Sequence, residues 1–133
     1  MTTYSVGMVG LGTMGRNLML NIADHKHSII GYVKDTTKVD QVKAIEDYSN
    51  ISATDNITQF VQSLERPARI ILLVPAGKIV DYVISDLTPL LSQGDIIIDG
   101  GNSYFKDTDR RYNDLKTKGI HFMGMGVSGG EKG

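Results

Sequence analysis

The sequence predicts an α/β domain in which a mostly parallel sheet is covered by helices on both faces. Short apolar segments, typical of strands, alternate along the 133 residues with longer segments whose apolar residues recur at helical spacing. Two of the short segments, residues 70–74 and 96–98, are continuously apolar, as expected of strands buried on both faces. The 15 glycines exceed the ~7% of an average composition, and several of them follow these segments. A chain of this length is expected to form one domain.

The first part of the chain contains two expected strand–helix pairs. Residues 4–9 form a strand-like run that leads into a glycine-rich turn, and residues 14–22 then carry apolar side chains at helical spacing. Residues 28–33 are the second expected strand. Residues 38–48 indicate a weakly amphipathic helix with valine and isoleucine on one side.

The middle of the chain continues the alternation. Residues 57–64 form a short amphipathic helix that Thr54 or Asp55 could cap. The apolar run 70–74 is a buried strand, and residues 79–87 repeat as the apolar stripe of the next helix.

The last part contains a further buried strand, a polar helix and a final strand. The strand covers residues 96–98, the exposed helix residues 108–118 and the last strand residues 120–123. The sequence then stops within the glycine-rich segment 126–133, so we expect residues 1–133 to be a domain truncated before its end.

Composition and charge exclude several classes of protein. Fourteen Lys and Arg against fifteen Asp and Glu give a net charge of -1, which provides no basic footprint for nucleic acid or a membrane surface. No apolar run approaches the ~18 residues that a membrane span needs. The sequence has no cysteine and three histidines without ligand partners, so we expect no metal site. This composition is compatible with a cytoplasmic location.

Gly10, Gly12 and Gly15 form a Gly-x-Gly-x-x-Gly motif between the first expected strand and its helix. In this context the motif indicates dinucleotide binding. Gly10 permits the tight turn, Gly12 lets the backbone approach a pyrophosphate, and Gly15 allows the helix to pack closely on the strand. Amides at the helix N-terminus would face the anion. The motif therefore predicts a doubly wound fold of the Rossmann type, although a turn that only saves space is the alternative.

The end of the second expected strand, Val33, Lys34 and Asp35, should lie near the adenosine ribose. Asp35 stands at the distance from the glycines where an acidic residue binds the ribose hydroxyls of NAD. Lys34, with Lys38 and two threonines, instead offers a cation and hydroxyl donors for the 2′-phosphate of NADP. The local sequence leaves NAD, NADP and a merely solvated loop open.

Three further segments carry candidate ligands. Val74, Pro75 and Ala76 provide a small-residue turn against which a cofactor could lie. The Asn102 amide could orient both a nicotinamide carboxamide and a substrate hydroxyl, or could close an Asx turn. The Ser-Gly-Gly segment at 128–130 is either an anion nest for a carboxylate or a tail.

Taken together, these segments resemble the 6-phosphogluconate dehydrogenase family, in its decarboxylating form, over residues 4–133. The resemblance is carried by Val-Gly-Leu-Gly-Thr-Met-Gly at 9–15, Ile-Ile-Leu-Leu-Val-x-Ala-Gly at 70–77, Gly-Asp-Ile-Ile-Ile-Asp-Gly-Gly-Asn-Ser at 94–103 and Gly-Val-Ser-Gly-Gly-Glu at 126–131. The last two are specific to this family or its nearest relatives. The sequence departs from the family at positions 33–35, where Asn-Arg-Thr is usual, and at Pro75, where lysine is frequent.

The resemblance implies an NAD(P)-binding Rossmann domain of an enzyme of the pentose phosphate pathway. This enzyme oxidises and decarboxylates 6-phosphogluconate to ribulose 5-phosphate and CO2, with NADP as the favoured coenzyme and NAD as the alternative. Implied cofactor-binding residues are Gly10, Leu11, Gly12, Thr13, Met14, Gly15, Val33, Lys34, Asp35, Val74, Pro75, Ala76 and Asn102. Implied substrate-binding residues are Asn102, Ser128, Gly129 and Gly130.

The resemblance also implies that no catalytic residue lies in this chain. The family's lysine base and glutamate acid, and the helical domain that completes the substrate pocket and forms the homodimer, follow in sequence after Gly133. We therefore expect this stretch to bind the coenzyme without turnover. Two alternatives are another β-hydroxyacid dehydrogenase, such as one acting on 3-hydroxyisobutyrate, and a non-catalytic dinucleotide-binding module.

Overall fold

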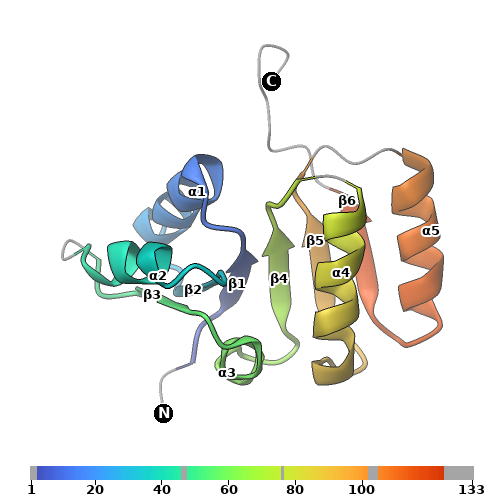
Figure 1. Cartoon of the computed structure of the whole chain (residues 1–133). Helices are drawn as coiled ribbons and strands as arrows, with labels where there is room; N and C mark the ends of the chain where they lie inside the picture. The colour runs from blue at the N-terminus through green and yellow to red at the C-terminus, as the bar shows by residue number, and fades with distance from the viewer. Residues whose placement is uncertain (1–2, 46–47, 76, 102–104, 125–133) are drawn as a thin grey trace.

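The structure, a computed structural model, describes residues 3–45, 48–75, 77–101 and 105–124. Six strands form one sheet with helices packed around it (Figure 1). In chain order the elements are β1 (Val6–Val9), α1 (Thr13–Asp24), β2 (Ile29–Tyr32), α2 (Thr36–Lys43), β3 (Ile51–Thr54), α3 (Ile57–Gln62), β4 (Arg69–Leu72), α4 (Lys78–Leu87), a 3₁₀ turn (Thr88–Leu90), β5 (Ile96–Asp99), α5 (Phe105–Lys116) and β6 (His121–Gly124). Among the described helices, none is both long and apolar enough to cross a membrane.

The strand order in the sheet is β3-β2-β1-β4-β5-β6, and every neighbouring pair is parallel. The chain builds outward from β1 to β3, then returns to the other side of β1 and builds outward again to β6. The direction of building therefore reverses between β1 and β4. At such a switch point the loops at the carboxyl ends of the two strands lead away from each other, which opens a crevice. The prediction of a doubly wound parallel fold is confirmed.

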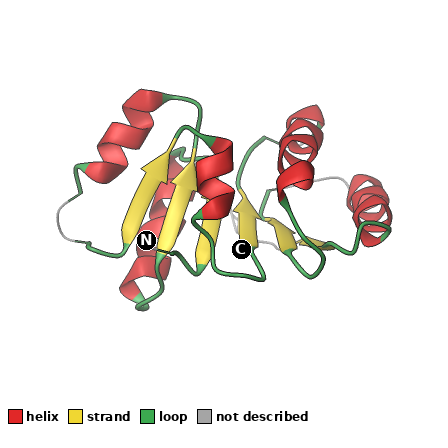
Figure 2. Cartoon of the chain, turned by 90° about the horizontal axis from the view of Figure 1, so that it is seen from below, coloured by secondary structure: helices red, strands yellow, loops and turns green. Residues whose placement is uncertain are grey.

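The buried side chains divide into two clusters, one on each face of the sheet, because successive residues of a strand point to opposite faces. In β1, Met8 belongs to the cluster with residues of α1 and α2, whereas Val9 belongs to the cluster with residues of α3, α4 and α5. In β4, Ile71 lies in the first cluster and Ile70 and Leu72 lie in the second. Figure 2 shows helices on both sides of the strands. This double coverage explains the continuously apolar run in β4.

The structure adds a strand that the sequence analysis did not predict. In β3 only Ala53 and Thr54 are buried, so the stretch carries a weak apolar signal. Its position depends on pairing with β2, in which Gly31 lies opposite Ala53 and Tyr32 opposite Thr54.

The predicted cap of the third helix is also wrong. The Asn56 side chain accepts a hydrogen bond from the Gln59 amide at 3.0 Å and caps α3, whereas Thr54 Oγ1 accepts from the Asn56 amide at 3.1 Å.

Candidate dinucleotide-binding site

The β1–α1 turn places its three glycines in different environments. Gly10 has a φ of 99°, and a Cβ there would lie 2.3 Å from the Leu73 carbonyl oxygen. A Cβ on Gly15 would lie 2.2 Å from the Gly10 carbonyl oxygen. Gly12 has a φ of -68°, and a Cβ there would have no atom of the described residues within 4 Å. The fold itself therefore requires Gly10 and Gly15, whereas Gly12 leaves the main chain open to an approaching ligand.

The N-terminus of α1 differs from those of α2 and α3. Asp35 and Asn56 cap the latter two helices with side-chain oxygens. The N-cap of α1 is Gly12, and within the described residues no side chain caps the helix and no acid stands in its first turn. The free amides and the positive end of the helix dipole lie beside the open side of Gly12. This combination fits the phosphates of a dinucleotide.

A hollow of about 260 Å³ adjoins this turn at the carboxyl ends of β1, β2 and β4. Four of the predicted cofactor residues line it: Gly10, Val33, Lys34 and Val74. The structure thus brings together segments that are more than 60 residues apart in sequence. The other lining residues were not predicted from the sequence to belong to the site, and these are Val9, Tyr32, Ile57, Ile79, Tyr82, Val83 and Asp86.

The α4 side of the hollow was not predicted from the sequence, because the apolar residues of this helix both fill the core and line the hollow. Val80 and Leu87 are fully buried in the core, as the apolar stripe predicted. Ile79 belongs to the same stripe in sequence but is 45% exposed, and Tyr82 is 64% exposed. Exposed apolar and aromatic side chains beside a hollow provide a surface on which a flat base can pack. Only the three-dimensional arrangement distinguishes this surface from the core face.

Tyr32 contributes a largely buried ring to the wall of the hollow. Its ring centroid lies 5.7 Å from that of Phe60, with the two planes tilted by 40°. Burial, and to a smaller extent the charges of Asp86 and Asp55, raise the pKa of Tyr32. The phenol is therefore protonated at neutral pH and can donate a hydrogen bond.

The end of β2 presents Lys34 and Asp35 in different roles. Lys34 is exposed at the edge of the hollow and, within the described part of the chain, forms no ion pair. Asp35 Oδ1 accepts a hydrogen bond from the Thr37 amide at 2.9 Å and so caps α2. One carboxylate oxygen of Asp35 is thus occupied by the helix that follows.

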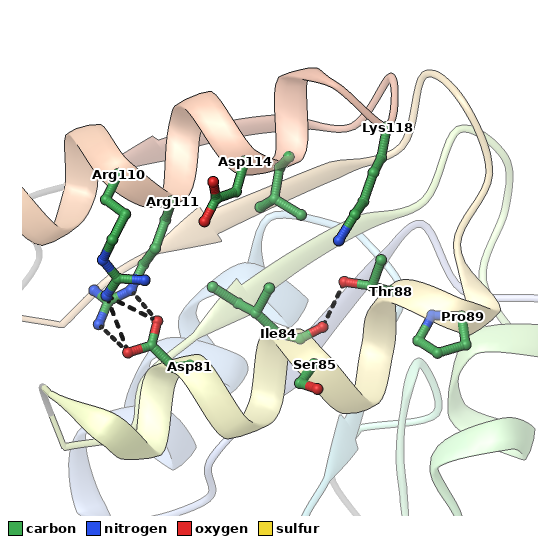
Figure 3. A pocket seen from close by; sticks show the side chains of 10 residues that line it. Asp81, Ile84, Ser85, Thr88, Pro89, Arg110, Arg111, Asp114 and Lys118 are labelled. Atoms are coloured by element: carbon green, nitrogen blue, oxygen red, sulfur yellow. Dashed lines mark hydrogen bonds and ion pairs between the residues drawn. The ribbon is translucent and has the colours of Figure 1, made fainter.

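A second cavity, of about 410 Å³, lies between α4 and α5 (Figure 3). It contains none of the residues that the sequence analysis assigned to the cofactor. Three of its charged groups pair with one another, because Asp81 on α4 binds both Arg110 and Arg111 of α5. The hydrogen bond from Arg111 is the main cause of a lowered pKa at Asp81. This groove is larger than the hollow beside the glycine turn, but it lies on the opposite side of α4. The hollow fits a dinucleotide better because it adjoins the glycine turn.

Some of the remaining predicted ligand-binding residues are exposed near the start of α1 or in the β4–α4 loop, one is buried in the core, and others lie outside the residues that the structure describes. The Leu11 side chain is 5% exposed and packs against Gly31 in the core, so only its main chain is available to a ligand. Met14 is 48% exposed near the start of α1, Thr13 opens that helix, and Pro75 is exposed. Ala76, Asn102, Ser128, Gly129 and Gly130 lie outside the described residues. In the described part, no cluster of His, Cys, Asp and Glu side chains could hold a metal ion.

The strand order, the glycine turn and the open end of α1 define a dinucleotide-binding domain of the Rossmann type. A family model described as the NAD-binding domain of 6-phosphogluconate dehydrogenase matches residues 5–133, and the chain belongs to this family. The resemblance noted from the sequence motifs is confirmed.

Individual relatives agree with the family assignment. The chain is 52% identical to the decarboxylating 6-phosphogluconate dehydrogenase 1 of Saccharomyces cerevisiae, over 96% of this chain and 26% of the relative. It is 48% identical to the enzyme of Bacillus subtilis, named NAD(+)-dependent and decarboxylating, over 97% of this chain and 28% of the relative. The chain thus spans little more than a quarter of the length of these curated relatives.

Solved structures show the same fold. The 6-phosphogluconate dehydrogenase of Plasmodium falciparum, described in its apo form and with NADP+ or 6-phosphogluconate, superposes with a TM-score of 0.87 at 34% identity, over 97% of this chain and 28% of that one. A 3-hydroxyisobutyrate dehydrogenase of Mycobacterium tuberculosis superposes with a TM-score of 0.79 at 19% identity, over 98% of this chain and 43% of that one. The latter likeness concerns the fold alone.

Proposed function

We propose that this chain is the NAD(P)-binding Rossmann domain of a decarboxylating 6-phosphogluconate dehydrogenase and that it binds NADP. The reaction oxidises the C3 hydroxyl of 6-phosphogluconate by transfer of a hydride to the coenzyme, and the resulting β-keto acid loses CO2 to give ribulose 5-phosphate. The names of relatives at about half identity support this activity. We further propose that the enzyme acts in the pentose phosphate pathway and in the cytoplasm.

One observation carries the coenzyme-binding part of the proposal: the open face of Gly12 in front of the uncapped N-terminus of α1. A pyrophosphate there would accept hydrogen bonds from main-chain amides and meet the positive end of the helix dipole. The adjoining hollow, with Val74, Ile79 and Tyr82 in its wall, would take the adenosine. The bound nicotinamide supplies the hydride acceptor, and the role of this chain is to bind and orient it.

The preference for NADP over NAD rests on the end of β2. The Lys34 ammonium is exposed at the edge of the hollow, where it could pair with a 2′-phosphate. Asp35 is engaged in capping α2, which makes it less available to ribose hydroxyls. Relatives of both kinds exist: the Plasmodium structure is described with NADP+, and the Bacillus enzyme is named NAD(+)-dependent.

Substrate binding and catalysis extend beyond the described residues. We propose that Asn102 contacts both coenzyme and substrate and that Ser128, Gly129 and Gly130 bind the sugar acid. We further propose that a lysine base, a glutamate acid and a homodimer interface lie in the part of the whole enzyme that this chain does not cover. The 133 residues alone should therefore bind the coenzyme but not reduce NADP with 6-phosphogluconate.

Calorimetric titration of the chain with NADPH and NADH tests the proposal. We expect Lys34→Ala to weaken NADPH binding about tenfold, the effect of losing one charge-assisted contact, and to leave NADH unchanged. Lys43→Ala, at the far end of α2, is the matched control and should alter neither affinity. Absence of binding to both coenzymes would overturn the proposed function. Equal affinities that do not respond to Lys34→Ala would overturn only the choice of NADP.

A further inference from the structure

We propose that Arg111 is a positioning residue for the nicotinamide half of the coenzyme, and that it acts by holding together the two loops that follow β4 and β5. The inference rests on the proposed function and concerns a residue of α5 that is distant in sequence from the glycine motif.

Arg111 fixes the first of these loops at the start of α4. Its side chain is 2% exposed and extends from α5 toward α4 (Figure 3). Nε donates to Asp81 Oδ1 at 2.8 Å, and Nη2 donates to Asp81 Oδ2 at 3.3 Å and to the Gly77 carbonyl oxygen at 3.1 Å. Gly77 is the N-cap of α4 and follows the predicted cofactor residues 74–76 directly. The guanidinium therefore binds both the last residue of this loop and the first turn of the helix.

The same guanidinium contacts the end of β5. Arg111 Nη1 lies 3.9 Å from Asp99 Oδ2, and the Asp99 side chain is also 2% exposed. Asp99 Oδ1 accepts a hydrogen bond from the Gly101 amide at 3.0 Å, which shapes the loop that leads to Asn102. Gly101 lies so close to the first loop that a Cβ there would be 3.1 Å from the Val74 carbonyl oxygen. The two loops thus touch, and Arg111 interacts with both.

The position of these loops relates them to the nicotinamide. A dinucleotide crosses the carboxyl edge of a doubly wound sheet at the switch point, with its two halves on opposite sides. In this chain the β2 side carries residues 33–35, which are the candidates for binding the adenosine ribose. The nicotinamide half would therefore extend toward the loops after β4 and β5. Arg111 lines the groove between α4 and α5 and not the hollow, so it would act through the loops and not by contact with the coenzyme.

The chemistry of the contact favours orientation over stability alone. Burying ions costs solvation energy, and an apolar cluster of the same size can be as stable as a buried ion pair. What the planar guanidinium adds is direction, because its donors fix a carboxylate and a carbonyl at set angles. Asp81 is ionised at neutral pH, and the hydrogen bond from Arg111 is the first cause of its lowered pKa, which shows that the pair favours the charged carboxylate.

Two ligands separate positioning from a general structural role. Adenosine 2′,5′-bisphosphate contains only the adenosine half with its phosphates, whereas NADPH contains both halves. We expect Arg111→Met to weaken NADPH binding about tenfold, as when a supporting contact of a binding site is removed. The bisphosphate should lose clearly less affinity, because Val74, Ile79 and Tyr82 also line the adenosine hollow but Lys34 and the glycine turn do not depend on Arg111. Arg111→Lys retains the charge but not the planar pair of donors, so it should keep the fold and show a smaller loss, again mainly for NADPH.

Arg110→Met is the matched control. Arg110 also donates to Asp81, at 3.2 and 3.1 Å, but it is 49% exposed and its described contacts include neither Gly77 nor Asp99. This variant should bind both ligands like the wild type. If Arg111→Met unfolds, as circular dichroism would show, Arg111→Lys carries the same test.

The outcomes are distinct. A selective loss for NADPH in the Arg111 variants supports the proposal. Equal loss of affinity for both ligands in folded variants overturns it. Wild-type affinity for NADPH in both Arg111 variants also overturns it. If Arg111→Met is unfolded, wild-type affinity for NADPH in Arg111→Lys is enough to overturn it. A wild-type chain that binds neither ligand would instead overturn the proposed function, on which this inference depends.

Discussion

Replacement of Gly12 by alanine should separate ligand binding from folding in the glycine turn. The backbone at Gly12 has φ -68° and ψ -175°, which alanine adopts without strain, and the new methyl group would meet no described atom within 4 Å. Alanine is a poorer N-cap than glycine, by up to ~1 kcal/mol, but it reduces the entropy of the unfolded chain by ~0.4–1 kcal/mol. The two effects nearly cancel, so the free energy of unfolding should change by less than about 0.5 kcal/mol.

The same methyl group should interfere with the coenzyme. It would occupy the space through which a pyrophosphate reaches the amides of the turn. Loss of one charge-assisted hydrogen bond costs ~1.5–3 kcal/mol, so we expect Gly12→Ala to weaken NADPH binding by about 10- to 100-fold. Gly15→Ala is the matched control, because its Cβ would lie 2.2 Å from the Gly10 carbonyl oxygen. This overpacking should cost ~1–3 kcal/mol of stability.

Urea unfolding followed by circular dichroism measures the stability of each variant, and calorimetric titration with NADPH measures binding. The expected result is a stable Gly12→Ala that binds poorly and a Gly15→Ala that unfolds at lower urea. Wild-type affinity in Gly12→Ala would refute the assignment of the open face to the pyrophosphate. A large loss of stability in Gly12→Ala would refute the claim that the fold does not need this glycine.

Two further substitutions test the electrostatics of the fold. Folding lowers the pKa of Asp81 from 3.8, and the hydrogen bond from Arg111 is the first cause. The ionised carboxylate therefore stabilises the folded state at pH values above 3.8, and this stabilisation is lost as the pH falls through the lower pKa of the folded state. The urea midpoints of wild type and Asp81→Asn should therefore differ at pH 7 and converge in acid, and a difference that does not depend on pH would contradict this. Asp95, 1% exposed at the amino end of β5, accepts hydrogen bonds from the amides of Ala68 at 2.8 Å and Ser92 at 2.7 Å, so Asp95→Ala should cost about 2–4 kcal/mol in urea unfolding. A loss below about 1 kcal/mol would show that these amides find other partners.

Both features that the sequence predicted well are properties of short stretches. The alternation of strands and helices follows from apolar periodicity, and the motif from Gly10 to Gly15 combines a local backbone requirement with its flanking elements. The strand β3 was missed because Ile51–Thr54 has no strong pattern of its own and forms only by pairing with β2. For Asp35, sequence distance from the glycines pointed to a ribose ligand, and the structure shows in addition that it caps α2.

The sequence by itself determined the doubly wound fold, the family and the glycine turn. The reason is that apolar periodicity, glycine spacing and the residues of a motif are all patterns of consecutive residues. Only the tertiary structure decided that Ile79 and Tyr82 of α4 complete the hollow beside that turn. It alone also decided that Arg111 binds the Gly77 carbonyl, 34 residues earlier in the chain. The physical reason is that the strand order brings α4 and α5 next to loops that are distant in sequence, and no local pattern encodes which side chains then meet.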